Sequence, residues 1–451
     1  MPKQLPDQFR LAPAMNLLEY RLVYLAGHSG LILLIAVTLA LLGNILYVAQ
    51  LSQTAATAPN SEIANSTKLS AGANSREEPE EVPAEPLLSV IIPAYNEANN
   101  IAACVQAVLQ ADHGSADRLQ VWVVDDQSSD DTLAIAHQLQ TQLQDPRLHI
   151  LAGSPRPQEP QWMGKNWACV QGAEQTCSPY LLFLDADMRL QPGAIATALH
   201  YLQQNHLDLL SVCPANQCGS LAEWLVQPLV FGVLCVGFPF AAVNDPQQEA
   251  AFASGQFMLF RRSAYDQLGG HWAVADQVVE DVELARLAKQ RGLHYRYVLG
   301  HQLATVRMYD SWASLWEGWT KNWYLGSGCN WRATVHLSVM VLLVCSLPWI
   351  GLLVFSTQAI LQPGNWISAL GAGITLVTIL LQFRLRQIIQ QLSAIPSRYW
   401  WLTGVGGGLM AAIAVGSLIK TETGWGWTWR GRSLKLPETT RKESTNPQQE
   451  A

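Results

Sequence analysis

Four stretches of this chain lack charged residues and are apolar over about the length that crosses the hydrocarbon core of a bilayer, roughly 20 residues. Only 14% of the 451 residues are charged and 49% are hydrophobic, a low charge content for a soluble protein. We therefore expect a multi-pass integral membrane protein. The four runs are Leu31–Gln50, Val335–Thr357, Trp366–Gln382 and Trp400–Ile419.

The first run is expected to be an uncleaved anchor over residues 31–50. A signal peptide has a short charged leader and an apolar core of roughly 7–15 residues, whereas here a whole segment, residues 1–30, comes first. A fifth apolar run, Trp224–Val243, is interrupted by Gln227, Pro228 and Pro239. We interpret this fifth run as an interfacial or buried helix.

Between the membrane segments the pattern predicts a flexible linker followed by a folded domain. Residues 51–86 are rich in Ala, Ser, Pro and Glu, a composition that buries too little apolar surface to order itself. Residues 87–330 alternate short apolar strands with amphipathic helices, as α/β sheets do. Beyond them we expect a C-terminal transmembrane region, 335–419, and a basic, aromatic and polar tail, 420–451. The expected strands are Leu88–Ile92, Gln120–Val124, Tyr180–Leu184 and Phe257–Arg261, and Ile101, Cys104, Val105 and Val108 share one helical face.

Cysteine spacing and net charge exclude some classes of function. The eight cysteines form no CxxC pair and no zinc-type spacing with histidine, so we expect reduced and mostly buried thiols. A net charge of -7 without a concentrated basic face argues against a nucleic-acid partner.

Two carboxylates directly follow the predicted strand Tyr180–Leu184. Asp185 and Asp187 are separated by one residue, and because strand side chains alternate, both point to the same side. Such a pair suits Mg²⁺ or Mn²⁺, which completes its shell with water and phosphate oxygens. The alternative is a surface turn after a strand, where Asp is common.

Asp125 and Asp126 follow the second strand. Carboxylates at the carboxyl end of a strand in an open α/β sheet lie where ligands bind, and there they can accept hydrogen bonds from a base or a ribose. Helix capping by Asp130 or Ser128 is the alternative for this segment. Capping does not account for Asp125 and Asp126, which precede the cap.

A third acidic site, Glu280 and Asp281, opens a predicted helix. Acidic residues in a first turn are favoured by the helix dipole, which is the plain structural explanation. The functional alternative makes one of them a general base for an acceptor hydroxyl.

At these sites the chain resembles the family 2 glycosyltransferases of the GT-A fold, over roughly Leu87–Asn322. Ser89–Glu97, with the sequence SVIIPAYNE, is similar to the family's opening strand and turn, and Val124–Ser128 to its nucleotide site. Asp185-Ala186-Asp187 is similar to its metal motif and Glu280-Asp281 to its catalytic acid pair. Together, four motifs in this order are specific.

The resemblance implies an α/β fold of the GT-A type, a mixed and mostly parallel sheet flanked by helices, joined here to transmembrane helices. It also implies a UDP- or GDP-sugar donor and a divalent metal, Mg²⁺ or Mn²⁺. The implied site residues are Pro93, Tyr95, Glu97 and Asp126 or Asp125 for the nucleotide, Asp185 and Asp187 for the metal, and Asp281 as the catalytic base.

The QxxRW motif carried by many polysaccharide-building relatives is absent. The corresponding region, 316–323, reads WEGWTKNW, so a processive polymerase is disfavoured. Lys321 is the candidate for the positive charge that the missing Arg would give to the diphosphate. On the acceptor side we expect Trp162, Glu280 and Trp319.

Two further stretches resemble a narrower group, the bacterial glycosyltransferases associated with carotenoids and hopanoids. Gln161–Ala168 is similar to the group's GWxGKxxA signature, although Gln161 stands where the group usually has Gly, and Trp429–Arg432 is similar to its C-terminal basic-aromatic motif. Lys165 is then a candidate phosphate ligand and Trp162 a stacking residue. For the C-terminal cluster we favour an aromatic belt at the membrane interface, and His271 is expected to be a packing residue. The belt would contain Trp425, Trp427 and Trp429, with Arg430 and Arg432 facing headgroups.

The expected function is an inverting transfer of sugar to a hydroxyl of a lipid-like acceptor, either a carotenoid, by 2'-O-glycosylation, or a hopanoid. The alternatives are a polyprenyl-phosphate sugar transferase and a non-catalytic membrane scaffold with a degenerate domain. Nucleotide-sugars are made in the cytoplasm, so the domain should face it, in agreement with Arg384, Arg386 and Arg398 between the last two runs. The tail would then lie outside if Trp400–Ile419 crosses fully, and a re-entrant or interfacial segment is the alternative.

Overall fold

The computed structural model describes residues 17–57, 87–111, 118–159 and 161–434. The first helix, α1 (Leu17–Thr57), is longer than the expected anchor and continues into the segment predicted as a linker. The rest of that predicted linker, 58–86, lies outside the described residues, as do 1–16 and 435–451 at the two ends.

The domain after α1 is built on a seven-stranded sheet in the order β3-β2-β1-β4-β8-β6-β9. Every neighbouring pair is parallel except those made by β8, which is antiparallel to both β4 and β6. The predicted mixed and mostly parallel sheet is therefore confirmed. The strands are β1 (Leu88–Ala94), β2 (Leu119–Asp125), β3 (Leu148–Ala152), β4 (Tyr180–Leu184), β6 (Leu209–Cys213), β8 (Phe257–Arg261) and β9 (Tyr295–Leu299).

Helices cover both faces of this sheet, which is why β4 is buried along its whole length. On one face the side chains predicted to share a helical stripe, including Ile101 and Val108, pack into one hydrophobic core. A second core lies on the opposite face. The first face carries α3 (Ile101–Ala111), α4 (Thr132–Leu143) and α6 (Ala194–Gln204); the second carries α5 (Gly164–Glu174), α9 (Arg262–Leu268) and α10 (Glu280–Gln290). A small sheet, β5 (Met188–Leu190), β10 (Ala304–Val306) and β7 (Ala215–Asn216), adjoins them.

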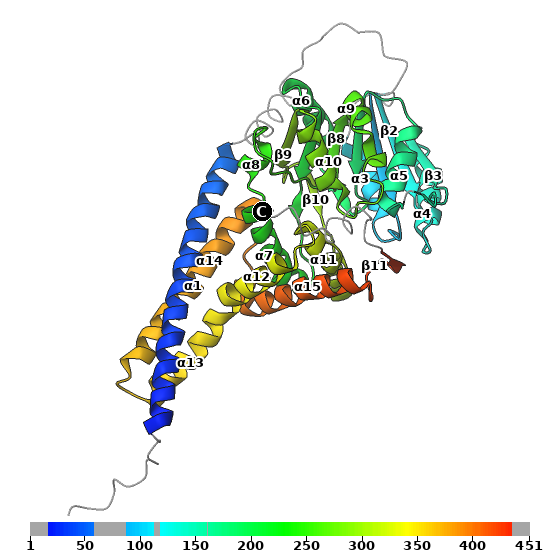
Figure 1. Cartoon of the computed structure of the whole chain (residues 1–451). Helices are drawn as coiled ribbons and strands as arrows, with labels where there is room; N and C mark the ends of the chain where they lie inside the picture. Colours follow the sequence, from blue (N-terminus) through cyan, green and yellow to red (C-terminus); the bar gives the residue numbers. More distant parts are fainter. Residues whose placement is uncertain (1–16, 58–86, 112–117, 160, 435–451) are drawn as a thin grey trace, which may run out of the picture.

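In the part of the chain that the structure describes, four helical stretches are long and apolar enough to cross a membrane, as predicted: Ser29–Gln50, Trp331–Leu361, Trp366–Ser393 and Trp400–Thr423. In Figure 1, α1, α13 (Leu347–Leu361) and α14 (Trp366–Ser393) extend together away from the sheet. By contrast, α15 lies along the base of the α/β domain, against three other helices. Those are α7 (Leu221–Gly237), α11 (Trp312–Gly326) and α12 (Trp331–Val341), while α15 itself spans Thr403–Thr423.

Two predictions about this region are wrong in detail. Arg384 and Arg386 belong to α14 rather than to a loop. The hydrophobic run expected over Trp224–Val243 breaks after Gly237 and resumes as the short α8 (Phe240–Asn244), because Pro239 cannot continue a helix hydrogen-bond ladder.

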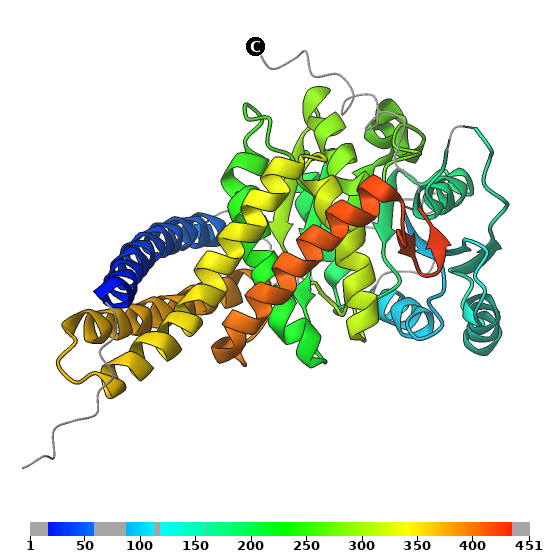
Figure 2. The same cartoon turned by 60° about the horizontal axis from the view of Figure 1, so that its bottom comes forward.

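The chain ends in a hairpin that returns to the α/β domain. After α15 terminates at Gly424, strands β11 (Thr428–Trp429) and β12 (Arg432–Ser433) pair antiparallel, and Figure 2 shows this red hairpin beside the domain. Trp427 is 2% exposed, so it is not part of the predicted aromatic belt. The hairpin contacts the α/β domain, an arrangement that agrees with the re-entrant or interfacial alternative for Trp400–Ile419.

Candidate active site

The predicted acidic sites meet at one edge of the central sheet. Strands β1, β2 and β4 are parallel neighbours, so the residues that follow them lie at the same edge. The third pair, Glu280 and Asp281, joins this edge through Lys165, near the start of α5. Lys165 Nζ lies 2.7 Å from Asp185 Oδ1 and 2.8 Å from Glu280 Oε1.

Lys165 and Glu280 hold each other in their charged forms. Burial alone would lower the pKa of Lys165, but the carboxylates of Asp185 and Glu280 outweigh it and raise that pKa well above the ordinary value. Burial would likewise raise the pKa of Glu280, yet the ion pair with Lys165 lowers it. The site therefore contains a fixed positive charge between the two acidic motifs.

Asp281 is a fixed carboxylate with a shifted pKa. Oδ2 accepts the N–H of Gly255 at 2.7 Å and Oδ1 accepts that of Val282 at 2.9 Å. Burial, followed by the charge of Glu280, raises the pKa of Asp281 to about 6. A Cβ at Gly255 would lie 2.9 Å from Asp281 Oδ2, so the backbone of Gly255 approaches the Asp281 carboxylate closely. Helix capping alone does not explain Asp281, because Gly255 belongs to another element.

Asp187 has the features expected of a metal ligand. Its Oδ1 is buried without a hydrogen-bond partner, and burial together with Asp185 raises the pKa of Asp187 well above the usual value. No cluster of three His, Cys, Asp or Glu is present in the described part of the chain. Two carboxylates fit a hard cation that takes its remaining ligands from water and phosphate.

The side chains predicted to contact the nucleotide are already paired with arginines from the C-terminal hairpin. Arg432 Nη1 forms an ion pair with Asp126 Oδ2, and its guanidinium carbon lies 3.4 Å from the ring centroid of Tyr95. Arg430 Nη1 lies 2.7 Å from Glu97 Oε1. The prediction that both arginines face headgroups is therefore wrong.

Arg430, Arg432 and their anchor Glu317 are the site residues that sequence reasoning missed. More than 300 positions separate Arg432 from Asp126, with the membrane helices between them, so no local pattern connects the two. The only signal was the WRGR motif at 429–432 itself, whose composition also fits a membrane interface.

Asp125, the last residue of β2, directly precedes Asp126 and is almost fully buried. Its Oδ2 accepts the N–H of Ser128 at 3.1 Å, whereas Oδ1 has no partner among the described residues. The capping alternative is only partly correct. Asp130 Oδ1 accepts the N–H of Thr132 at the start of α4, but the Ser128 hydroxyl accepts the N–H of Asn96 instead.

The GWxGK-like loop supports Asp126 rather than presenting an aromatic face. Trp162 is 4% exposed and packs edge-on against Trp167 and Trp272, so the predicted stacking of Trp162 on a ligand is wrong for this structure. A glycine is needed at residue 164 because a Cβ there would lie 2.1 Å from Asp126 Oδ2. Asn166, buried beneath, donates to the carbonyls of Val274 and Gln277.

Comparison with known proteins agrees with this geometry. Residues 89–269 match the Glycosyl transferase family 2 description. The chain contains a family 2 glycosyltransferase domain. It is 25% identical over 268 residues to a 4,4'-diaponeurosporenoate glycosyltransferase of Staphylococcus haemolyticus, covering 59% of this chain and 68% of the relative. The corresponding Staphylococcus aureus enzyme is 27% identical over 53% of this chain and 62% of its own length.

The match thus spans about two thirds of these relatives. Among solved structures, a mannosyltransferase from Pyrobaculum calidifontis, in complex with GDP-Man and Mn²⁺, is 17% identical and superposes with a TM-score of 0.45, covering 87% of this chain and 98% of its own.

Helix α11 brings Lys321 toward the acidic groups at this edge of the sheet. Lys321 Nζ lies 4.2 Å from the ring centroid of Trp429, and burial lowers the pKa of Lys321 to about 8. Trp319 donates its indole N–H to Gln227 on α7 at 2.8 Å and neighbours Tyr309, with ring centroids 6.2 Å apart. His271, buried against Phe183 and hydrogen-bonded to Tyr265, is a packing residue.

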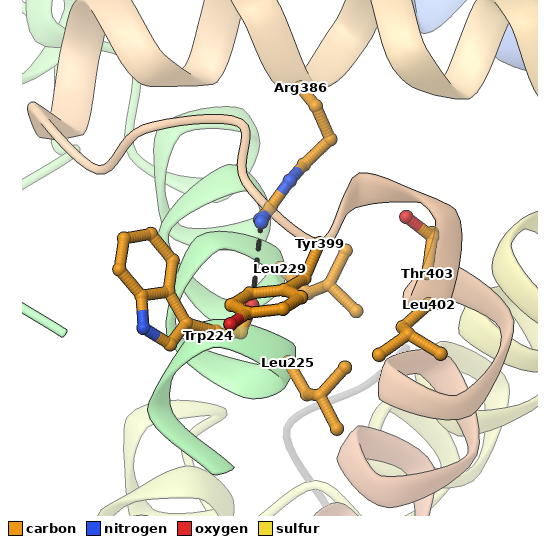
Figure 3. Close-up of a pocket in the computed structure, with 7 residues that line it drawn as sticks. All are labelled: Trp224, Leu225, Leu229, Arg386, Tyr399, Leu402 and Thr403. Carbon is orange, nitrogen blue, oxygen red and sulfur yellow. Dashed lines mark hydrogen bonds between the residues drawn. The ribbon is translucent and has the colours of Figure 1, made fainter. Parts of the chain in front are cut away.

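A separate pocket of the glycosyltransferase lies between α7, α14 and the turn before α15 (Figure 3). Arg386 points into it from α14 and donates to the carbonyl of Trp224 at 3.4 Å. Arg386 is 5% exposed, and its Nε and Nη1 have no partner among the described residues. The lining consists of Trp224, Leu225, Leu229, Arg386, Tyr399, Leu402 and Thr403.

Proposed function

We propose that this chain is an inverting glycosyltransferase that transfers a sugar from a UDP- or GDP-sugar to a hydroxyl of a lipid-like acceptor. The observation that carries the proposal is the placement of Asp281. Its carboxylate is held by the Gly255 N–H and has a pKa of about 6, while Lys165 links its neighbour Glu280 to Asp185 at the donor edge. A base near neutral pKa beside a cationic donor site suits transfer to a hydroxyl.

In the proposed donor complex, the nucleotide lies at the ends of β1 and β2. Pro93, Tyr95, Glu97, Asp125 and Asp126 line that edge, and Lys165 and Lys321 supply positive charge for the diphosphate. Asp185 and Asp187 would hold Mg²⁺ or Mn²⁺, as the unpaired Oδ1 of Asp187 supports. Such an ion, when bound, neutralises charge on the diphosphate leaving group.

The proposed transfer is a single displacement at the anomeric carbon. Asp281 takes the proton of the acceptor hydroxyl while its oxygen forms the bond to that carbon. The bond to the diphosphate oxygen breaks on the opposite side, and its electron pair leaves with the nucleoside diphosphate. The configuration inverts in this one step, so no covalent sugar-enzyme intermediate is required.

For the acceptor we propose a carotenoid or hopanoid confined to the bilayer. The named relatives act on 4,4'-diaponeurosporenoate, and four helical stretches here are apolar enough to cross a membrane. Helix α7 and Trp319, tied together through Gln227, are proposed to line the acceptor path. We further propose residues 87–330 as the catalytic domain, facing the cytoplasm where nucleotide-sugars are made.

A second candidate acceptor is an anion. The name of the relatives' substrate denotes a carboxylate, and a carboxylate or a polyprenyl phosphate needs little base catalysis because it is already deprotonated. Asp281→Asn separates these candidates. Loss of turnover supports the hydroxyl acceptor, whereas retained turnover supports an anionic one.

The test is mass spectrometry of membrane lipids and pigments from cells with and without this gene. The cells that lack the gene are complemented with either the wild-type gene or the Asp281→Asn variant. A glycosylated carotenoid or hopanoid that only the wild type restores supports the proposal. An unchanged lipid profile with altered polyprenyl-linked sugars shifts it to the polyprenyl-phosphate reaction. If no nucleotide-sugar binds in a thermal-shift screen, the alternative of a non-catalytic membrane scaffold with a degenerate domain would be favoured.

A further inference from the structure

Resting on the proposed function, we propose that the C-terminal hairpin, residues 425–434, is a wall of the donor site and that Arg430 is a diphosphate-binding residue. Neither the family match, which ends at residue 269, nor the position of this segment beyond the last membrane helix assigns it such a role. Two features of the structure support this role: the anchoring of the hairpin and the nitrogen atoms of Arg430 that stay available to a ligand.

Glu317 on α11 fastens the hairpin to the site. Its Oε1 accepts the hydroxyl of Thr428 at 2.6 Å, and its Oε2 accepts the backbone N–H of Arg430 at 3.1 Å. Trp427 is buried beneath the hairpin, and Leu434 donates to the Trp427 carbonyl at 2.9 Å. The hairpin is therefore held from its own backbone, which leaves its two arginine side chains to face the domain.

Arg430 is anchored through one nitrogen only. Nη1 donates to the carbonyls of Tyr95 and Asn96 at 2.8 and 2.7 Å and pairs with Glu97. In the described part of the chain, Nη2 and Nε have no polar partner. A guanidinium fixed at one nitrogen with further donors available is suited to phosphate oxygens, which arginine contacts with parallel hydrogen bonds.

Arg430 lies at the edge of the sheet that carries the proposed metal ligands. It pairs with Glu97, which follows β1, and β1 is the parallel neighbour of β4, which Asp185 and Asp187 follow. Glu97, Asp185 and Asp187 at this edge would repel an incoming diphosphate, and Lys165 is already paired with Asp185 and Glu280. The QxxRW arginine of related enzymes is absent at 316–323, and Arg430 adds positive charge to that of Lys321 from a different part of the chain.

Arg432 covers the part of the site proposed for the nucleobase of the donor. It pairs with Asp126 and lies over the ring of Tyr95, two of the side chains proposed to contact the nucleotide. A donor nucleobase that hydrogen-bonds to Asp126 therefore replaces Arg432 as its partner, while Arg430 stays anchored through Nη1. In this proposal Arg432 occupies the nucleobase position when no donor is bound, and Arg430 faces the phosphates of the donor.

The test measures binding of UDP and GDP, with Mn²⁺, to the full-length protein in detergent by calorimetry, with uridine and guanosine as phosphate-free competitors. Arg430→Ala should weaken binding of the diphosphate by about ten- to a hundredfold and change nucleoside binding less than about twofold. Arg430→Lys should restore part of the loss. Glu317→Gln should weaken diphosphate binding in the same direction, with little further effect when added to Arg430→Ala.

Arg286→Ala is the matched control, because Arg286, on the surface of α10, pairs only with Glu283 within the described ranges. This variant should bind the nucleotides as wild type does. The inference is overturned if Arg430→Ala binds the diphosphate as tightly as wild type, or if it loses nucleoside and diphosphate binding equally. A wild type that binds neither UDP nor GDP instead refutes the proposed function. An unchanged melting temperature of Arg430→Ala excludes misfolding.

Discussion

The backbone N–H of Gly255 donates to Oδ2 of Asp281 at 2.7 Å, which fixes the proposed base from outside its own helix. We predict that Asp281→Asn lowers kcat by about 10²–10⁴-fold, the usual contribution of a general base. Asn keeps the shape but cannot take the acceptor proton. Initial rates at saturating donor, with donor affinity measured separately, test this effect.

The matched control is Asp276→Asn, since among the described residues Asp276 bonds only the adjacent Gln277 side chain. This variant should keep wild-type turnover. An equal loss of kcat in both variants would mean that replacing any carboxylate in this region by an amide lowers turnover, and that Asp281 has no special role.

The pH dependence should be bell-shaped. Asp281 must be deprotonated to act as a base, so activity should rise with pH through its pKa of about 6, falling about tenfold per pH unit below it. Lys321 must be protonated to attract the diphosphate, so activity should fall as pH rises through its pKa of about 8. Measurement of kcat/KM from about one pH unit below the lower pKa to about one pH unit above the higher pKa checks both limbs.

Lys321→Arg tests the alkaline limb by itself. Arginine stays protonated throughout this range, so the decline near pH 8 should move upward or disappear while the acid limb stays in place. If the decline persists unchanged in Lys321→Arg, another group is responsible for it.

Gly164→Ala should weaken donor binding without unfolding the protein. A Cβ at residue 164 would lie 2.1 Å from Asp126 Oδ2, so the carboxylate must shift from its present position. Alanine is otherwise favourable at a helical position. We expect a loss of about tenfold in UDP or GDP affinity at an unchanged melting temperature, and no loss for Gly326→Ala, where nothing lies within 4 Å.

Topology can be tested with single exposed thiols. Trp425, 78% exposed, precedes the hairpin, and Cys177 is an exposed cysteine of the α/β domain. A membrane-impermeant maleimide should label Cys177 in the wild type and Trp425→Cys in a Cys177→Ser background from the same side of sealed vesicles. Labelling from opposite sides would contradict the packing of residues 425–434 on the domain.

The sequence was sufficient for four strands of the sheet and for locating the acidic motifs. Strands such as Tyr180–Leu184 and Phe257–Arg261 form with the expected bounds, because strand formation there follows from local apolar runs. The stripe that includes Ile101 and Val108 is buried as its helical period requires. These features depend on residues close together in the chain.

Only the tertiary structure decided what surrounds those motifs. Trp162 packs inward against Trp272, and the arginines of the hairpin contact Glu97 and Asp126 although three apolar helical stretches separate them in the chain. The sequence by itself determined an α/β domain with three acidic sites beside apolar helices, since periodicity and motif spacing are local properties. The partners of those acids come from other elements: Lys165 joins Asp185 to Glu280, and Arg432 reaches Asp126 from more than 300 residues away. Only the folded chain brings these groups together, because through-space electrostatics leaves no local pattern in the sequence.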